Sequence, residues 1–267
     1  MTGKLRELIA WELQDNWAFP VLELILAITI IQVLPIVSLY RNVTNFSMPF
    51  WRSMVYVFVI CVAVIFGRSF GEGVEKRKLV VLLSYPVSRV RVFAAKFLAN
   101  FLALLLVFGG VLFVEGLSYF MFKSVYRDMY PMYPYTFSDL APTIFALMFL
   151  SLFLVVFFAS SLMTFLSLAM KRFGLSIMVF LVYALGMEYW TNLQFGTKDP
   201  GLYLSFQYGP NAIVTYLHSW HYNTLGIGYS RTGITPSIFL TAFCYPLVGG
   251  LLLLLASLFL IRRIDLD

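Results

Sequence analysis

Apolar stretches alternate with short polar segments along the whole chain. A helix needs about 20 apolar residues to cross the hydrocarbon core of a bilayer, and six stretches reach or approach that length. The predicted membrane-spanning helices cover residues 19–39, 50–68, 93–119, 141–169, 174–190 and 236–261. The pattern therefore predicts an all-α polytopic membrane protein, folded as a single transmembrane domain over residues 1–267.

Two segments outside these spans have a pattern of their own. Residues 1–18 carry apolar side chains along one helical stripe, with tryptophans beside it, which is typical of a helix lying in the membrane interface. Residues 191–235 are too long for a plain connector and form the largest predicted outer loop. Composition agrees, because only 12% of the residues are charged, whereas soluble proteins have about 25%.

Lysine and arginine set the predicted orientation. With both termini in the cytoplasm, most of the 19 basic residues lie on the cytoplasmic side, as the positive-inside rule requires. The net charge of +6 then reports topology and does not indicate nucleic-acid binding. We expect a multi-pass protein of the plasma membrane, in contact with lipids and with no nucleic-acid partner.

The densest charge lies in the predicted cytoplasmic segment 69–92, between the second and third spans. Acidic and basic residues come first, and three leucines follow at spacings that place them on one face of a short helix. Pro86 disfavours helical geometry at the residue before it, so this helix ends there. Ser88 stands where it can cap the helix of the third span. A charged loop of this kind suits contact with a soluble partner.

This order of residues resembles the cytoplasmic coupling region of ATP-binding-cassette (ABC) type-2 permeases, the membrane subunits of many ABC exporters. In that family an acidic and a basic residue precede Gly-Thr, a leucine-rich turn, Pro-Val-Ser-Arg and a lysine that opens the third span. The matching positions here are Glu75, Lys76, Leu79, Leu82, Leu83, Ser84, Pro86, Val87, Ser88, Arg89 and Lys96. The chain departs from the pattern at Arg77 and Lys78, where Gly-Thr is usual.

The resemblance implies a non-catalytic permease subunit that exports an amphipathic or hydrophobic substrate. The chain has no G-x-x-x-x-G-K-[ST] phosphate loop and binds no cofactor itself, so ATP and Mg²⁺ would be bound by a separate ATPase subunit. Two permease chains, identical or related, would pair with two ATPase chains. The residues expected to couple permease to ATPase are Glu75, Lys76, Leu79, Leu82, Leu83, Pro86, Ser88 and Arg89. The leucines would fill a cleft on the ATPase, and the charged residues would orient it from the rim.

Polar residues inside the predicted spans are candidates for a translocation path, because their burial in lipid is costly. Glu23, near the inner end of the first span, is one candidate, with snorkelling to the surface as the alternative. A stripe in the fourth span is another, made of Ser160, Thr164 and Ser167 at i, i+4 and i+7. The alternative there is a surface at which helices pack closely.

Three other functions remain open. The same ATPase-linked subunit could pass mechanical work to an extracytoplasmic protein without transport. An intramembrane enzyme would need polar catalytic groups at one depth. His218 and His221 lie in the outer loop, and Cys61 and Cys244 are isolated, so we predict no catalytic or metal site. An ion channel or secondary carrier would show paired internal repeats, which we do not find in the sequence.

Overall fold

The computed structural model describes residues 59–84, 88–107, 142–193 and 236–264, with the isolated helical positions 7, 10 and 109. Every regular element in these ranges is helical. The elements are η2 (Gly67–Glu72), α4 (Gly73–Glu75), α5 (Lys78–Ser84), α7 (Pro142–Met170), α8 (Phe173–Leu193) and α10 (Pro236–Arg262). Two further helical segments cover 59–66 and Arg89–Val107. The predicted first span with Glu23, most of the interfacial helix and most of the loop 191–235 lie outside the described residues.

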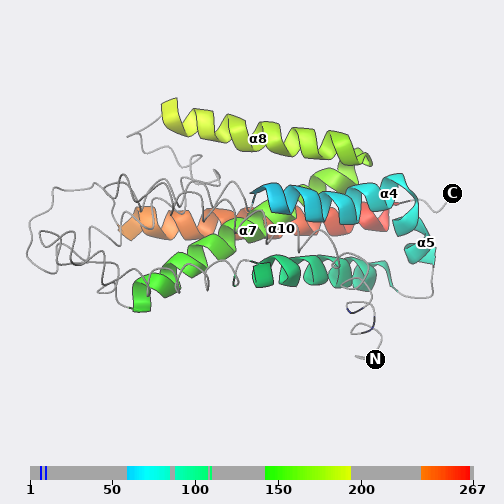
Figure 1. The fold of residues 1–267 in the computed structure, drawn as a ribbon, viewed down its shortest axis with the longest axis horizontal. Helices are drawn as coiled ribbons and strands as arrows, with labels where there is room; N and C mark the ends of the chain where they lie inside the picture. Colours follow the sequence, from blue (N-terminus) through cyan, green and yellow to red (C-terminus); the bar gives the residue numbers. More distant parts are fainter. Residues whose placement is uncertain are drawn as a thin grey trace, which may run out of the picture.

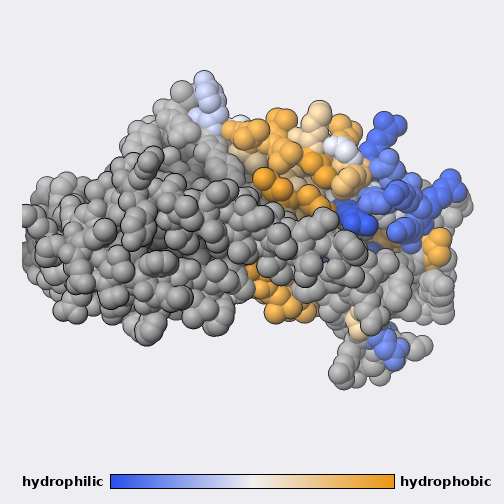
Figure 2. Space-filling view, in the orientation of Figure 1, coloured by the Kyte–Doolittle hydropathy of each residue, from blue (hydrophilic) through white to orange (hydrophobic). Residues whose placement is uncertain are grey.

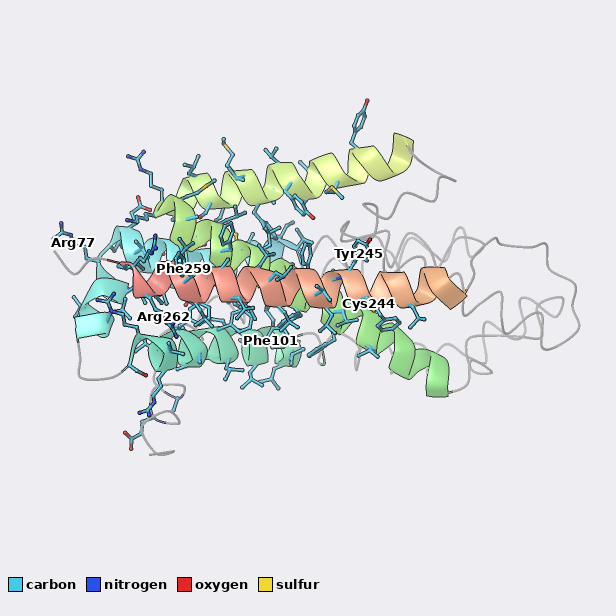
Figure 3. The ribbon with its side chains drawn as sticks, turned by 180° about the vertical axis from the view of Figure 1, so that it is seen from behind. Arg77, Phe101, Cys244, Tyr245, Phe259 and Arg262 are labelled. Carbon is cyan, nitrogen blue, oxygen red and sulfur yellow. The ribbon has the colours of Figure 1, made fainter. Side chains whose placement is uncertain are left out.

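The long helices run roughly side by side along one axis of the molecule (Figure 1). α7 crosses α10 obliquely and packs against it. α8 lies on one side of this pair and the helix Arg89–Val107 lies on the other, as Figures 1 and 3 both show. The short helices α4 and α5 lie at the end of the bundle where α10 terminates. The charged loop is therefore placed at one end of a helical bundle.

Three apolar helical stretches are long enough to cross a membrane, namely Arg89–Val107, Phe153–Met170 and Phe243–Arg262. They overlap three of the six predicted spans. Large apolar side chains remain exposed on the outer faces of the helices. On α8 these are Leu175, Met178, Val182 and Leu185, and Figure 2 shows hydrophobic surface over this helix. Exposed apolar surface of this extent is unusual in a soluble monomer and is compatible with a membrane location.

Aromatic side chains hold the second helical segment to the third. Phe66 and Phe70 stand one helical turn apart, as do Phe93, Phe97 and Phe101. The ring centroids of Phe66 and Phe97 are 5.4 Å apart, and those of Phe70 and Phe93 are 5.7 Å apart. Two rings of α7 meet Phe97 and Phe101 edge-on. Such tilted and edge-on pairs add to the stability that burial alone provides.

The second helix continues beyond residue 68, where its span was expected to end. It passes into the π-helix η2 and then into α4. Gly67 and Gly71 allow η2 to approach α7 and α8, since a Cβ on Gly71 would lie 3.2 Å from the Cα of Phe173. Ser69 is buried as well, so protein still encloses this turn and the exposed Arg68 does not end the helix. π-helical turns are rare and often occur at functional sites.

Candidate functional site

A tight turn connects α4 to α5. The amide of Lys76 donates to the carbonyl of Glu72 at 2.8 Å, and the amide of Arg77 donates to the carbonyl of Val74 at 3.0 Å. Arg77 has a φ of 58°, in the left-handed region that costs a non-glycine residue roughly 1–2 kcal/mol. The type-2 permease pattern that this loop resembles has glycine at this position. The arginine therefore adopts the backbone conformation that glycine favours, at a cost in strain.

The apolar face of α5 packs against the chain itself. Leu79 is fully buried and Leu83 is 4% exposed, and both belong to the hydrophobic core. Among the α5 side chains that the structure describes, Val81 is the exposed apolar one, at 58%. The side chain of Leu82 and the whole of Pro86 lie outside what the structure describes. We expected the leucines to face a partner, and the structure instead uses Leu79 and Leu83 to hold α5 on the bundle.

Glu75 binds the beginning of α8. Its Oε2 accepts a hydrogen bond of 2.9 Å from the backbone N–H of Phe173, the first residue of that helix. The first N–H groups of a helix have no partner within it, and the helix dipole places partial positive charge there. A carboxylate from a distant part of the chain therefore caps α8 with the favourable sign of charge.

Arg89 binds the end of α10 in the same manner but with the opposite charge. Its Nη1 donates to the carbonyl oxygens of Arg262 and Ile264, both at 2.8 Å. These carbonyls lie at the negative end of the helix dipole, where a cation is favourable. Just before Arg89, the carbonyl of Ser88 accepts from the amide of Val92 at 3.2 Å. Ser88 therefore occupies the N-cap position of the third helix, as its sequence position predicts.

The acidic side chains described at this end are engaged within the chain. Glu72 pairs with Lys76 and with Arg68, whose Nε lies 3.6 Å from Glu72 Oε2. The hydrogen bond from Lys76, helped by the nearby positive charges, lowers the pKa of Glu72. Figure 2 shows hydrophilic residues gathered at this end. The exposed basic residues are Arg68, Lys76, Arg77, Lys78, Arg91, Lys171, Arg172, Arg262 and Arg263.

A buried polar cluster links η2 to the third helix. The Oγ of Ser69 accepts from Asn100 Nδ2 at 2.8 Å and from Lys96 Nζ at 3.3 Å. Asn100 Nδ2 also donates to the carbonyl of Lys96 at 2.8 Å. The sequence pattern singled out Lys96 but neither of its neighbours. The spacing of Asn100, four residues after Lys96 on the same helical face, is the signal that could have indicated the cluster.

The polar stripe of α7 is enclosed by protein. Ser160, Thr164 and Ser167 are fully buried, and Thr164 Oγ1 donates to the carbonyl of Ser160 at 2.7 Å. Ser167 lies beside η2, because its Oγ is 3.5 Å from the position of a Cβ on Gly71. Within the described residues the hydroxyls of Ser160 and Ser167 have no hydrogen-bond partner. The structure therefore encloses the stripe in protein, with Ser167 next to η2.

Comparison with known proteins adds no assignment. No protein-family model matches the chain, and no curated protein or solved structure matches it either. Among the residues that the structure describes, no group of three or more His, Cys, Asp or Glu side chains is placed to hold a metal ion. The case for a function therefore rests on the residues of the charged loop and on their contacts with α8 and α10.

Proposed function

We propose that the chain is the membrane subunit of an ABC exporter. It crosses the plasma membrane six times with both termini in the cytoplasm, pairs with a second permease chain and moves an amphipathic or hydrophobic substrate outward. The energy comes from ATP, bound with Mg²⁺ on a separate ATPase subunit. The apolar helices of membrane length support the membrane part of this proposal.

The observation that carries the proposal is the way in which α5 is held. Glu75 precedes α5 and Arg89 follows it in the sequence, and their side chains bind the ends of α8 and α10. These contacts join residues 98 and 173 positions apart in the sequence. A loop that only connected two neighbouring helices would need neither of them. Such contacts suit a loop that receives a force and passes it to the bundle.

The surface left for the ATPase is the outer side of the loop. Val81 provides an exposed apolar residue, and the basic residues Lys76, Arg77 and Lys78, three to five positions before it in the sequence, are exposed as well. Buried apolar anchors dominate the affinity of most interfaces, while charges at the rim govern orientation and the rate of association. We therefore assign docking to Val81 and its basic rim, and anchoring of α5 to the buried leucines.

Purification of the tagged chain from native membranes, with partners identified by mass spectrometry, tests the proposal. We expect a stoichiometric soluble subunit that carries a phosphate-binding loop. Val81→Asp should reduce recovery of this subunit by about tenfold or more, as loss of an interface anchor does, whereas Val81→Ile should not. Recovery of the wild-type chain with no ATPase in any detergent would refute the proposal.

Reconstitution in liposomes then separates export from transmission of force to an outer protein. The probe is a fluorescent amphipathic dye, added to vesicles that contain the chain and its ATPase. Export predicts that the dye raises the ATPase rate and crosses the membrane only when ATP is present. An ATPase rate indifferent to any such dye, with no dye movement, would argue against export.

A further inference from the structure

Glu75 and Arg89 stand on either side of α5 in the sequence, and both turn toward the bundle. Glu75 Oε2 lies 2.9 Å from the amide nitrogen of Phe173, and Arg89 Nη1 lies 2.8 Å from the carbonyl oxygen of Arg262. Figure 3 shows Arg262 at the end of α10 beside the loop helices, with Arg77 at the outer edge of the molecule. The charged residues of the loop therefore divide into an inward pair and an outward group.

We infer that Glu75 and Arg89 are positioning residues that carry a displacement of α5 to α8 and α10, instead of being contacts made with a partner. The inference deepens the proposed function and rests on it, because the ATPase is what would displace α5. The two hydrogen-bonded contacts belong to the chain alone. They are therefore open to measurement whether or not the ATPase is present.

The contacts resist separation because each one satisfies groups that the helix cannot satisfy itself. The amide of Phe173 and the carbonyl of Arg262 lie at helix ends, where no partner is available along the helix. Each contact also places a charged side chain at the end of a helix whose dipole has the opposite sign. A movement of α5 must therefore either carry these helix ends with it or leave both groups without their partners.

The contact of Glu75 also reaches α7. α7 ends at Met170 and α8 begins at Phe173, so only two residues join them. In this connection Lys171 has a φ of 55°, and its amide donates to the carbonyl of Ser167 at 3.1 Å, which closes the end of α7. A short connection fixed in this way leaves α8 little freedom to move independently of α7. A pull on Phe173 thus acts on the junction of two long helices.

The remaining contacts of the loop keep α5 from moving independently of its flanking residues. Leu79 and Leu83 are buried on the bundle side, and Glu72 pairs with Lys76 across the turn before α5. Arg89 is itself the first residue of the third helix. The part of this segment that the structure describes before Ser88, residues 76–84, is therefore packed through its buried leucines and joined to the turn that contains Glu75.

Hydrogen exchange of the purified chain tests whether the contacts exist. Glu75→Ala should raise the exchange rate of the first amides of α8 by about tenfold or more, as expected for a lost charged hydrogen bond. Arg89→Met should do the same in the last turn of α10 and leave α8 unchanged. Arg91→Ala is the matched control, because it removes an exposed charge from the same predicted segment 69–92, and neither of the two helix-end contacts involves its side chain. It should leave both ends unchanged.

Trapping the ATPase subunit with ATP, Mg²⁺ and orthovanadate tests transmission. In the wild-type complex, trapping should change exchange at the beginning of α8 and at the end of α10. With Glu75→Ala the response should be lost at α8 and kept at α10, and Arg89→Met should give the reverse. Glu75→Gln, which keeps a side-chain oxygen acceptor, should restore part of the response. A role in folding alone would not remove the response at one helix end while keeping it at the other.

Three results would overturn the inference. Unchanged exchange in both variants would show that the contacts are not made. If the responses to trapping persisted at both helix ends in the variants, the contacts would not transmit the movement of α5. The proposed function would still stand in that case, provided that the ATPase co-purifies. A wild-type chain that binds no ATPase would remove the proposed function as well, and that result is scored independently of the variants.

Discussion

Substitution of Gly71 by alanine tests the close approach of η2 to α8 on which the position of the charged loop depends. The added methyl group would lie 3.2 Å from the Cα of Phe173 and 3.3 Å from the Oγ of Ser176. Ordinary contacts are 3.4–4 Å, so a neighbour must move by a few tenths of an ångström. The Cα belongs to the backbone at the end of α8 that Glu75 caps, and it has little freedom to move.

Two terms set the magnitude of this change. Overpacking of a close interface costs about 1–3 kcal/mol, and alanine is favoured over glycine within a helix by roughly 0.5–1 kcal/mol. We expect a net loss of up to about 2.5 kcal/mol, since the second term offsets part of the first. For a chain of this size each kcal/mol lowers the unfolding midpoint by about 2–4 °C.

Gly186→Ala is the matched control for Gly71→Ala. Gly186 lies in the middle of α8 and a Cβ there would have no neighbour within 4 Å, so only the helical preference for alanine applies. We expect its midpoint to rise by roughly 1–4 °C, measured by thermal unfolding in detergent. If Gly71→Ala raised the midpoint as much as the control, η2 would not lie against α8 as described.

Four further substitutions test other features of the structure by the same thermal assay. Arg77→Gly should raise the midpoint, because it removes left-handed strain of roughly 1–2 kcal/mol, and a decrease would contradict the turn geometry. Ser69→Ala should lower stability by about 0.5–1.5 kcal/mol because it removes the hydrogen bonds that Asn100 Nδ2 and Lys96 Nζ donate to the Ser69 hydroxyl, whereas Ser167→Ala, which removes a buried hydroxyl with no partner among the described residues, should not. The pKa of Glu72 in the folded chain is below its ordinary value of 4.5. The ionised carboxylate therefore adds to the stability of the fold above pH 4.5, and this stabilisation is lost as the pH falls through the pKa of the folded state. Glu72→Gln should therefore show a smaller loss of stability than the wild-type chain on acidification below pH 4.5.

Hydropathy predicted the long helices because their ends coincide with changes in polarity. α7 covers Pro142–Met170 against an expected 141–169, and α10 covers Pro236–Arg262 against 236–261. In both cases a pair of basic residues follows the apolar stretch directly. The third helix begins at residue 89 and not at 93. Ser88 in the N-cap position sets the first turn of this helix, and an average of hydropathy along the sequence does not detect a cap.

The contacts of the loop could not be predicted in the same way. The three leucines form one apolar face, but that pattern is the same whether the face packs on its own chain or on a partner. Glu75 and Arg89 matched a known order of residues, yet their partners lie 98 and 173 positions away and leave no local signal. The π-helical turn has no distinctive composition either. Its glycines and serine would suit close packing in any helix.

The loop thus combines three kinds of residue that a linear pattern presents as one motif. Leu79 and Leu83 are buried, Glu75 and Arg89 bind helix ends, and Val81 is exposed on the outer side. Because each kind of residue affects a different measurable quantity, substitutions of the three kinds should have different effects. Loss of a buried leucine should lower the stability of the chain alone. Under the proposed function, loss of a helix-end contact should remove the response of one helix to trapping, and a charge at Val81 should prevent docking of the ATPase. A single phenotype shared by all three kinds would mean that the loop acts only as a binding motif.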